Sequence, residues 1–390
     1  MSLIAKWSAA RAAAIVIPLV AAMATSGCAG SKRAQRLQRA EIQKRLGALE
    51  KPGLLIGEFP LESILDGDTV RVVGLDSSLR LHGLDTEETF KTEGDRRLFE
   101  GGWEEYLKEK RGNSKHPVKM ATPLGEEAKK FAKHFFEDSP TVRLERDDPM
   151  ELRDRYGRYL AYVFAKKNNE WVNYDIECVR AGMSPYFMKY GYSKRFHREF
   201  VQAEREAREA QLGIWSPDGM HYPDYPERHR WWTARAEFIK QIEDANEGRK
   251  DFIVLTHWDS LLRLEKFEGR EVTLLGLVSD VRLGDRGPAV AKLGRSGKGN
   301  DFALVFFDKD VFGSSQVAQY KGEPVQVKGT VTRYRPRGRD SELQMAVKLP
   351  GQIVGRRMEG AAPIIPDDED DVPRASVQSP EKGRDAAPPP

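Results

Sequence analysis

Cysteine is scarce in this chain: only two, Cys28 and Cys178, occur among 390 residues. Two cysteines cannot form the disulfide framework of a small secreted domain, and the seven histidines are scattered without a paired Cys or His at zinc-ligand spacing. The sequence therefore excludes a disulfide scaffold and a structural zinc site. Cys178 lies in a short helical pattern at residues 173–182, which predicts a small buried side chain.

Long apolar runs are lacking as well. The run at residues 12–24, which follows Lys6 and Arg11, is too short to cross a bilayer but suits the hydrophobic region of a signal peptide. It leads into Thr-Ser-Gly-Cys, which resembles a bacterial lipobox, and this resemblance implies that Cys28 carries a lipid. We therefore expect residues 1–27 to be a signal peptide.

The expected location is the cell envelope. Residues 28–50 are polar, basic and rich in Ala and Gln, and we expect them to tether the lipidated cysteine to the folded domains. The protein would then be lipid-anchored at the outer membrane or the cell surface, with the membrane as a partner. Ordinary secretion and a retained N-terminal anchor are the alternatives if the lipobox is not used.

Neither sign of charge is in large excess. The 63 Lys and Arg residues against 60 Asp and Glu residues give a formal net charge of +3, so the chain is not a polycation. Any attraction to nucleic acid must come from local patches rather than from the net charge. The length predicts two or three domains.

What is present is a set of acidic residues and arginines in two short segments. The first contains Asp-Gly-Asp-Thr-Val at residues 66–70, then Arg80, then Asp-Thr-Glu-Glu-Thr at residues 85–89. The second is Asp-Arg-Tyr-Gly-Arg-Tyr-Leu-Ala-Tyr at residues 154–162. Carboxylate oxygens suit a hard divalent cation, a carboxylate can act on water, and guanidinium groups neutralise phosphate. This combination is typical of phosphodiester hydrolysis.

With a closing Leu-Gly-Ile-Trp-Ser at residues 212–216, these motifs resemble, in their order, the staphylococcal nuclease (thermonuclease) family over residues 55–216. The resemblance implies an OB-type β-barrel and a Ca²⁺-dependent, sugar-non-specific endonuclease. Its expected partners are single-stranded DNA and RNA, which it would cleave to 3′-phosphate ends. The alternative is a non-catalytic envelope lipoprotein that binds nucleic acid or protein, and an eroded active site would mark that case.

The resemblance also implies the metal ligands and the base. Asp68, Asp85 and the main-chain carbonyl of Thr86 would hold Ca²⁺, with Asp66 as a supporting residue. Glu88 would act as the general base on a water molecule. The plainer interpretation is that Asp68 only forms a turn and Asp85 only ends a strand.

Two arginines and two tyrosines complete the expected site. By the same resemblance, Arg80 and Arg158 would hold the phosphate oxygens, and Tyr156 and Tyr190 would lie against the nucleotide, where a ring can stack on any base. Surface salt bridges are the alternative for the arginines, and core packing is the alternative for the tyrosines. Glu87 departs from the family pattern, which has proline there, and is expected to add flexibility and negative charge beside the site.

The chain as a whole is predicted to be mainly β with helices, an α+β protein. The expected parts are a nuclease-like domain at 51–217, a linker and helix at 218–250, an OB-like barrel at 251–357 and a disordered tail at 358–390. Residues 217–232 are predicted to be the linker and residues 234–247 the helix. Residues 90–120 exceed the family loop, and we expect a lid or a partly disordered loop there.

The second barrel contains a basic loop with an aromatic residue: Arg333, Tyr334, Arg335, Arg337 and Arg339. OB barrels use such loops to hold nucleic acid, and an ordinary solvated loop is the alternative. We expect this barrel to raise affinity for long strands and to leave the chemistry to the first domain, with a protein partner as the alternative. Truncation near Pro217 is then expected to weaken binding of long strands and to leave cleavage of short ones unchanged.

Overall fold

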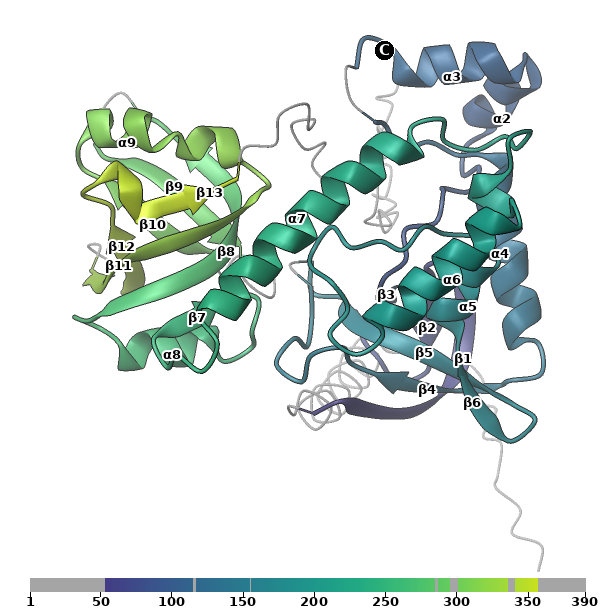
Figure 1. The fold of residues 1–390 in the computed structure, drawn as a ribbon, viewed down its shortest axis with the longest axis horizontal. Coiled ribbons are helices and arrows are strands. Elements are labelled where there is room, and N and C mark those ends of the chain that lie inside the picture. The colour runs from purple at the N-terminus through teal and green to yellow at the C-terminus, as the bar shows by residue number, and fades with distance from the viewer. Residues whose placement is uncertain are drawn as a thin grey trace, which may run out of the picture. The chain divides into compact units, whose positions relative to one another are not determined.

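Two closed β-barrels with covering helices make up the described part of this computed structural model, which covers residues 53–114, 117–154, 156–284, 287–294, 301–335 and 341–356 (Figure 1). The protein is therefore of the α+β class, as predicted. The expected signal peptide, Cys28, the tether and the C-terminal tail lie outside the described residues. Within the described ranges, no helix is both long and apolar enough to span a membrane.

The first barrel closes through a parallel pair of strands. Its sheet runs in the order β3-β2-β1-β4-β5-β6, and an additional β3–β5 pairing completes the ring. The strands are β1 (Leu55–Asp66), β2 (Thr69–Val72), β3 (Leu79–Leu81), β4 (Thr141–Glu145), β5 (Tyr159–Lys167) and β6 (Glu170–Asn173). Because β3 lies beside both β2 and β5, residues from the two sequence motifs are brought to one end of the barrel.

Helices cover this barrel. They are α4 (Pro123–Phe136), α5 (Tyr174–Arg180), α6 (His197–Glu209) and the short η1 (Gly213–Trp215). Helix α4 begins at a typical start signal for a helix: Thr122 caps it by accepting from the Gly125 amide at 3.1 Å, and Pro123 occupies its first turn. Ala128 and Ala132 of this helix are fully buried. Cys178 on α5 is buried and free, as predicted.

The insertion at residues 90–120 contains two helices in its described part, α2 (Glu93–Glu100) and α3 (Trp103–Arg111), in place of an irregular loop. Tyr106 fixes α3, because its ring is fully buried and its hydroxyl donates to the carbonyl of Ala121 at 2.7 Å. The ring belongs to an apolar cluster that also includes Phe90, Met120 and Leu124. The expectation of partial disorder is therefore wrong for α2 and α3.

Helix α7 (Tyr225–Ala245) begins well before the predicted position. Pro226 lies in the predicted linker, but proline is accommodated in the first turn of a helix, and it lies there in α7. Farther along, the guanidinium of Arg235 donates to the carbonyl of Lys189 at 3.0 Å, which attaches α7 to the first domain. The part predicted as linker is thus partly helical and well packed.

The second barrel repeats the strand order of the first. Its ring runs β8-β9-β10-β12-β11 and closes through the β11–β8 pair. These strands are β8 (Glu271–Arg282), β9 (Ala289–Gly294), β10 (Phe302–Phe306), β11 (Pro324–Tyr334) and β12 (Glu342–Ala346). Two short strands, β7 (Phe252–Val254) and β13 (Ile353–Gly355), extend the sheet at its edges. The remaining elements are α8 (Ser260–Lys266), α9 (Lys309–Ser315), η2 (Val317–Tyr320) and η3 (Pro350–Gln352).

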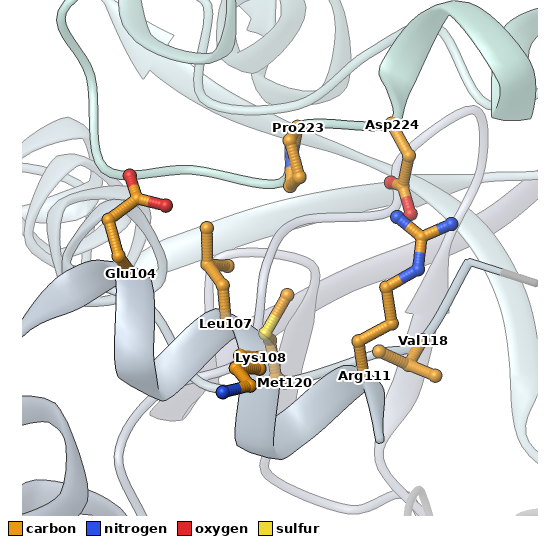
Figure 2. A pocket seen from close by; sticks show the side chains of 8 residues that line it. All are labelled: Glu104, Leu107, Lys108, Arg111, Val118, Met120, Pro223 and Asp224. Atoms are coloured by element: carbon orange, nitrogen blue, oxygen red, sulfur yellow. The ribbon is translucent and has the colours of Figure 1, made fainter. Parts of the chain in front are cut away.

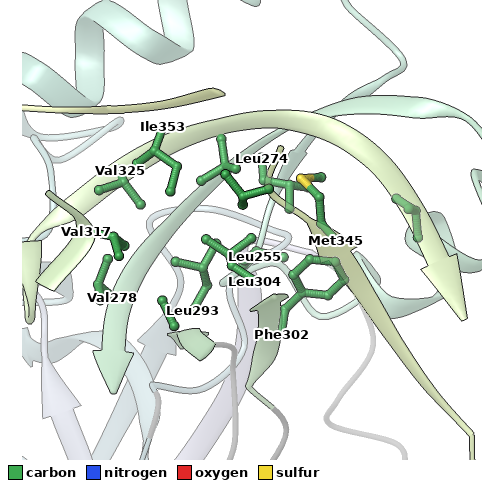
Figure 3. Close-up of a cluster of buried hydrophobic side chains, with 14 of the residues drawn as sticks. Leu255, Leu274, Val278, Leu293, Phe302, Leu304, Val317, Val325, Met345 and Ile353 are labelled. Atoms are coloured by element: carbon green, nitrogen blue, oxygen red, sulfur yellow. The ribbon is translucent and has the colours of Figure 1, made fainter. Parts of the chain in front are cut away.

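In both barrels a helix lies between the third and fourth ring strands in chain order: α4 lies between β3 and β4, and α9 lies between β10 and β11. This is the arrangement expected of an OB-type barrel. In the second barrel, Leu274, Leu304 and Met345 point into a single apolar core (Figure 3). Gly329 lies in β11 because an added Cβ would come within 2.7 Å of the Met345 sulfur. The prediction of a second OB-like barrel is therefore confirmed.

Candidate active site

Buried groups that contact Gly67 fix the turn between β1 and β2. The hydroxyl of Tyr174 donates to the carbonyl of Gly67 at 2.6 Å, and a Cβ on Gly67 would lie 2.8 Å from the methyl group of Thr86. Asp66 accepts from the hydroxyl of Thr89 at 2.8 Å. The turn, and with it the carboxylate of Asp68, is therefore tied to the segment that contains Thr86 and Thr89.

Arg80 brings two of the predicted metal ligands together. Its guanidinium, on β3, forms ion pairs with Asp68 and with Asp85, the latter at 3.0 Å. Both aspartates are 7% exposed. Lys119 contacts the same oxygen of Asp85 at 3.0 Å, so the pair of carboxylates is surrounded by positive charge.

These residues fit a Ca²⁺ ion by their donor chemistry. Asp68 and Asp85 lie close enough to share one cationic partner, and carboxylate and carbonyl oxygens are the ligands that Ca²⁺ prefers. Thr86 is buried beside them, and its Oγ1 has no hydrogen-bond partner. No group of three or more His, Cys, Asp or Glu side chains is placed to bind a metal within the described ranges. The predicted group of Ca²⁺ ligands consists of only two carboxylates, those of Asp68 and Asp85, and the main-chain carbonyl of Thr86.

Glu88 follows on the same segment and is only partly exposed. Its carboxylate accepts from the ammonium group of Lys91 at 2.7 Å. Burial raises the pKa of Glu88 above its usual 4.5, and the charges of Lys119 and Lys91 act in the opposite direction. The backbone is fixed as well, because the carbonyl of Glu88 accepts from the Thr122 amide at 3.0 Å. Glu88 is thus a carboxylate held beside the aspartate pair.

Arg158 is oriented by Asp154, four residues earlier in the second motif. Asp154 accepts from Nε of Arg158 at 2.8 Å and from the Arg158 amide at 2.9 Å. The Arg158 guanidinium lies 5.6 Å from the centre of the Tyr156 ring. A cavity of 230 Å³ is lined by Arg80, Arg158, Tyr156, Tyr190 and Lys119, among others. The predicted phosphate-binding and nucleotide-binding residues therefore border one space, and Tyr190 is 52% exposed there.

Three contributors to this site were not assigned a role from the sequence. Lys119 comes from the insertion and has no motif around it, so its contact with Asp85 could not be foreseen. Phe187 lies under the guanidinium of Arg80, 5.6 Å from the ring centre. Asp154 did carry a signal, because it opens the second motif, but its role in orienting Arg158 depends on the turn geometry.

Glu87 differs from its expected behaviour. It is 1% exposed and accepts hydrogen bonds from Thr122, from the Tyr222 amide at 2.6 Å and from the Tyr225 hydroxyl at 2.8 Å. Burial raises its pKa to about 7, against the effect of these donors. The expectation of added flexibility is wrong, because the carboxyl group is enclosed and hydrogen-bonded.

A second cavity, of 340 Å³, is lined by other residues. Figure 2 shows Leu107, Arg111 and Met120 on one side of it and Pro223 and Asp224 on the other. None of the predicted site residues lines it. We therefore assign the candidate site to the smaller cavity, where the arginines and tyrosines meet.

The basic loop of the second barrel is described only in part. Arg333 is paired with Glu268 at 2.9 Å, Tyr334 is 52% exposed and Arg335 is exposed. Arg337 and Arg339 lie outside the described residues.

Replacing Tyr174 by Phe is expected to loosen the turn that carries Asp68. The Gly67 carbonyl would lose its donor in a buried position, which costs about 1–3 kcal/mol of unfolding free energy. Chemical denaturation measures this loss, and hydrogen exchange should show faster exchange in residues 66–69. A Tyr320→Phe variant, altered in the other barrel, serves as the control. Unchanged stability and exchange in Tyr174→Phe would contradict this role of the hydroxyl.

A closed five-stranded barrel with a helix between its third and fourth strands in the sequence defines a class, the OB-type barrels. Residues 78–217 match the family model described as staphylococcal nuclease homologue. The thermonuclease of Staphylococcus hyicus is 30% identical over 158 residues, which cover 39% of this chain and 72% of the relative. An uncharacterised protein of Methanocaldococcus jannaschii is 32% identical over 161 residues, covering 39% of this chain and 69% of the relative. The thermonuclease of Staphylococcus intermedius is 29% identical over 159 residues, covering 40% and 75%. The chain therefore belongs to the staphylococcal nuclease family.

Proposed function

We propose that this protein is a Ca²⁺-dependent endonuclease that hydrolyses phosphodiester bonds of single-stranded DNA and RNA to 3′-phosphate ends. The observation that carries the proposal is the Arg80 guanidinium between Asp68 and Asp85, beside a cavity that Arg158, Tyr156 and Tyr190 also line. Relatives named thermonucleases share the domain. The five side chains expected for metal binding and catalysis are all present, which favours an enzyme over a binding protein.

The proposed mechanism assigns one task to each side chain. Asp68, Asp85 and the Thr86 carbonyl would hold Ca²⁺, which when bound supplies positive charge to the phosphate and to a water molecule. Glu88 removes the proton from the attacking water. Arg80 and Arg158 bind the non-bridging oxygens, where negative charge develops in the transition state, and Arg158 enters this role already oriented by Asp154.

The tyrosines favour a substrate without base pairing. Tyr190 exposes half of its surface at the cavity, and Tyr156 lies beside the Arg158 guanidinium. Rings in such positions stack on unpaired bases with little sequence preference. The enzyme would therefore act on DNA and RNA alike.

Analysis of the product ends tests the reaction. A single-stranded oligonucleotide is digested with Ca²⁺, and the fragments are weighed by mass spectrometry. The proposal requires 3′-phosphate and 5′-hydroxyl ends. Fragments with 5′-phosphates would contradict it, because the leaving group would then be the 3′-oxygen instead of the 5′-oxygen.

The envelope location is a separate part of the proposal and depends on Cys28. We expect Cys28→Ser to lose lipid labelling and to leave the membrane fraction. Membrane association that persists in this variant would favour an uncleaved N-terminal anchor.

A further inference from the structure

After the first barrel is complete, the chain again contacts the catalytic segment, residues 86–90, which contains the predicted ligand Thr86 and the predicted base Glu88. Residues 216–225 follow η1 and place Tyr222 and Tyr225, both almost fully buried, against residues 87–90. The Tyr222 amide and the Tyr225 hydroxyl donate to the same oxygen of Glu87, at 2.6 and 2.8 Å. Thr122 donates to the other oxygen. A buried carboxyl group is thus bound by three donors, two of which come from beyond the family match.

The position of Glu87 in the chain gives these contacts a consequence for the site. Glu87 is flanked by Thr86, the predicted carbonyl ligand, and by Glu88, the predicted base. The backbone around it is tightly enclosed, since a Cβ on Gly125 would come within 2.1 Å of the Glu88 carbonyl oxygen and 2.8 Å of the Glu87 carbonyl oxygen. Because this backbone has little free space, we expect a change at the Glu87 side chain to displace the groups on both sides of it.

Residues 222–228 are attached at further points. The Tyr222 hydroxyl donates to the Met120 carbonyl at 2.8 Å, and Arg228 donates to the Val118 carbonyl at 2.7 Å. Arg228 is also paired with Asp224 at 2.6 Å. Figure 2 shows Pro223 and Asp224 facing the side chains of Val118 and Met120. The same residues 118–122 bind Glu88 through Thr122, so these attachments support the catalytic segment from its other side.

We propose that Glu87 is a positioning residue of the nuclease site and that residues 222–228 complete this site from outside the barrel. The inference rests on the proposed function and adds to it a structural requirement. Proline, the residue of the family pattern at this position, has no side-chain acceptor for the Tyr222 amide and the Tyr225 hydroxyl. Truncation near Pro217 would remove two donors from a buried carboxyl group. In place of the expectation from the sequence that cleavage of short strands stays unchanged, truncation should then lower the cleavage of short strands as well as long ones.

The test is a double-mutant cycle in the full chain. Glu87→Ala is expected to lower kcat by roughly 10²-fold with little change in KM for a short oligonucleotide, because the Thr86 carbonyl and the Glu88 carboxylate are displaced while the arginines and tyrosines stay in place to bind the substrate. Glu87→Gln keeps an acceptor for both donors and should retain most of the activity. Tyr225→Phe should lower kcat by itself and have little further effect in the Glu87→Ala background.

Tyr222→Phe is the matched control, because the Tyr222 hydroxyl binds Met120 and only the backbone amide binds Glu87. Its effect should add to that of Glu87→Ala. Equal losses in Glu87→Gln and Glu87→Ala, or full additivity of Tyr225→Phe with Glu87→Ala, would overturn the proposal. So would a change confined to KM.

A readout without substrate separates this inference from the proposed function. Hydrogen exchange of residues 84–90 should be faster in Tyr225→Phe and in Glu87→Ala, and near wild type in Glu87→Gln. If the wild-type protein fails to cleave nucleic acid but the three variants show this exchange pattern relative to it, the proposed function is wrong and the positioning role of Glu87 stands. If it cleaves and exchange is the same in all variants, the positioning role is wrong.

Discussion

The Arg158→Lys variant is expected to lose roughly 10³-fold in kcat while it stays folded. Lysine keeps the charge but lacks the planar fork that can bind two phosphate oxygens, and it cannot present an Nε hydrogen to Asp154 in the same geometry. Because the phosphate gains negative charge only as the reaction proceeds, the loss should fall on kcat more than on KM. Single-turnover cleavage of a short DNA strand measures it.

Arg143→Lys provides the control for this substitution. Arg143 lies on β4 and is paired with Glu145 at 2.6 Å, and it does not line the cavity of the site. This variant should cleave at the wild-type rate. Wild-type kcat in a folded Arg158→Lys protein would show that Arg158 serves only its ion pair with Asp154.

The Glu88→Gln variant is expected to lose roughly 10²–10⁴-fold in kcat, the usual contribution of a positioned general base. Glutamine has nearly the same shape and can still accept from Lys91, so the segment should keep its conformation. It cannot take a proton from water. The steady-state rates at saturating substrate, compared with thermal unfolding of the same samples, separate lost chemistry from lost folding.

Glu127→Gln, an exposed change on α4, is the matched control and should be fully active. A nucleophile supplied in place of water also distinguishes Glu88 as a base from Glu88 as a positioning residue, because an anionic nucleophile has no proton that a base must remove. If Glu88 only positions the segment, the Gln variant should be close to wild type, and the base would have to be sought among the other carboxylates.

The two barrels could be predicted because their strands carry local signals. Alternating residues of β11 are apolar and polar, and this pattern, with Gly276 and Gly329 inside strands, resembles that of an OB barrel. The motif residues Asp68, Arg80 and Asp85 could be named because the segments that contain them resemble the staphylococcal nuclease family. Local pattern is enough for such features, since each depends on residues near in sequence.

What could not be predicted depends on contacts between distant segments. The burial of Glu87 comes from Tyr222 and Tyr225, and a glutamate with no visible partner is normally expected in solvent. Residues 217–232 are rich in Pro, Tyr, His and Trp and were predicted to be a linker, whereas the buried Tyr225 and Trp232 fix the start of α7 there, with Pro226 in its first turn. Packing overrode the local signal in both places.

Cleavage of single-stranded DNA by the purified protein, first with Ca²⁺ and then with excess chelator, tests the central claim most directly. We expect cleavage with Ca²⁺, no cleavage in chelator and recovery when Ca²⁺ is restored. Mg²⁺ should substitute poorly, because it requires a tighter octahedral shell than two carboxylates and a carbonyl provide. The Asp68→Asn and Asp85→Asn variants should need far more Ca²⁺ for half-maximal rate. Full cleavage in excess chelator would contradict the account.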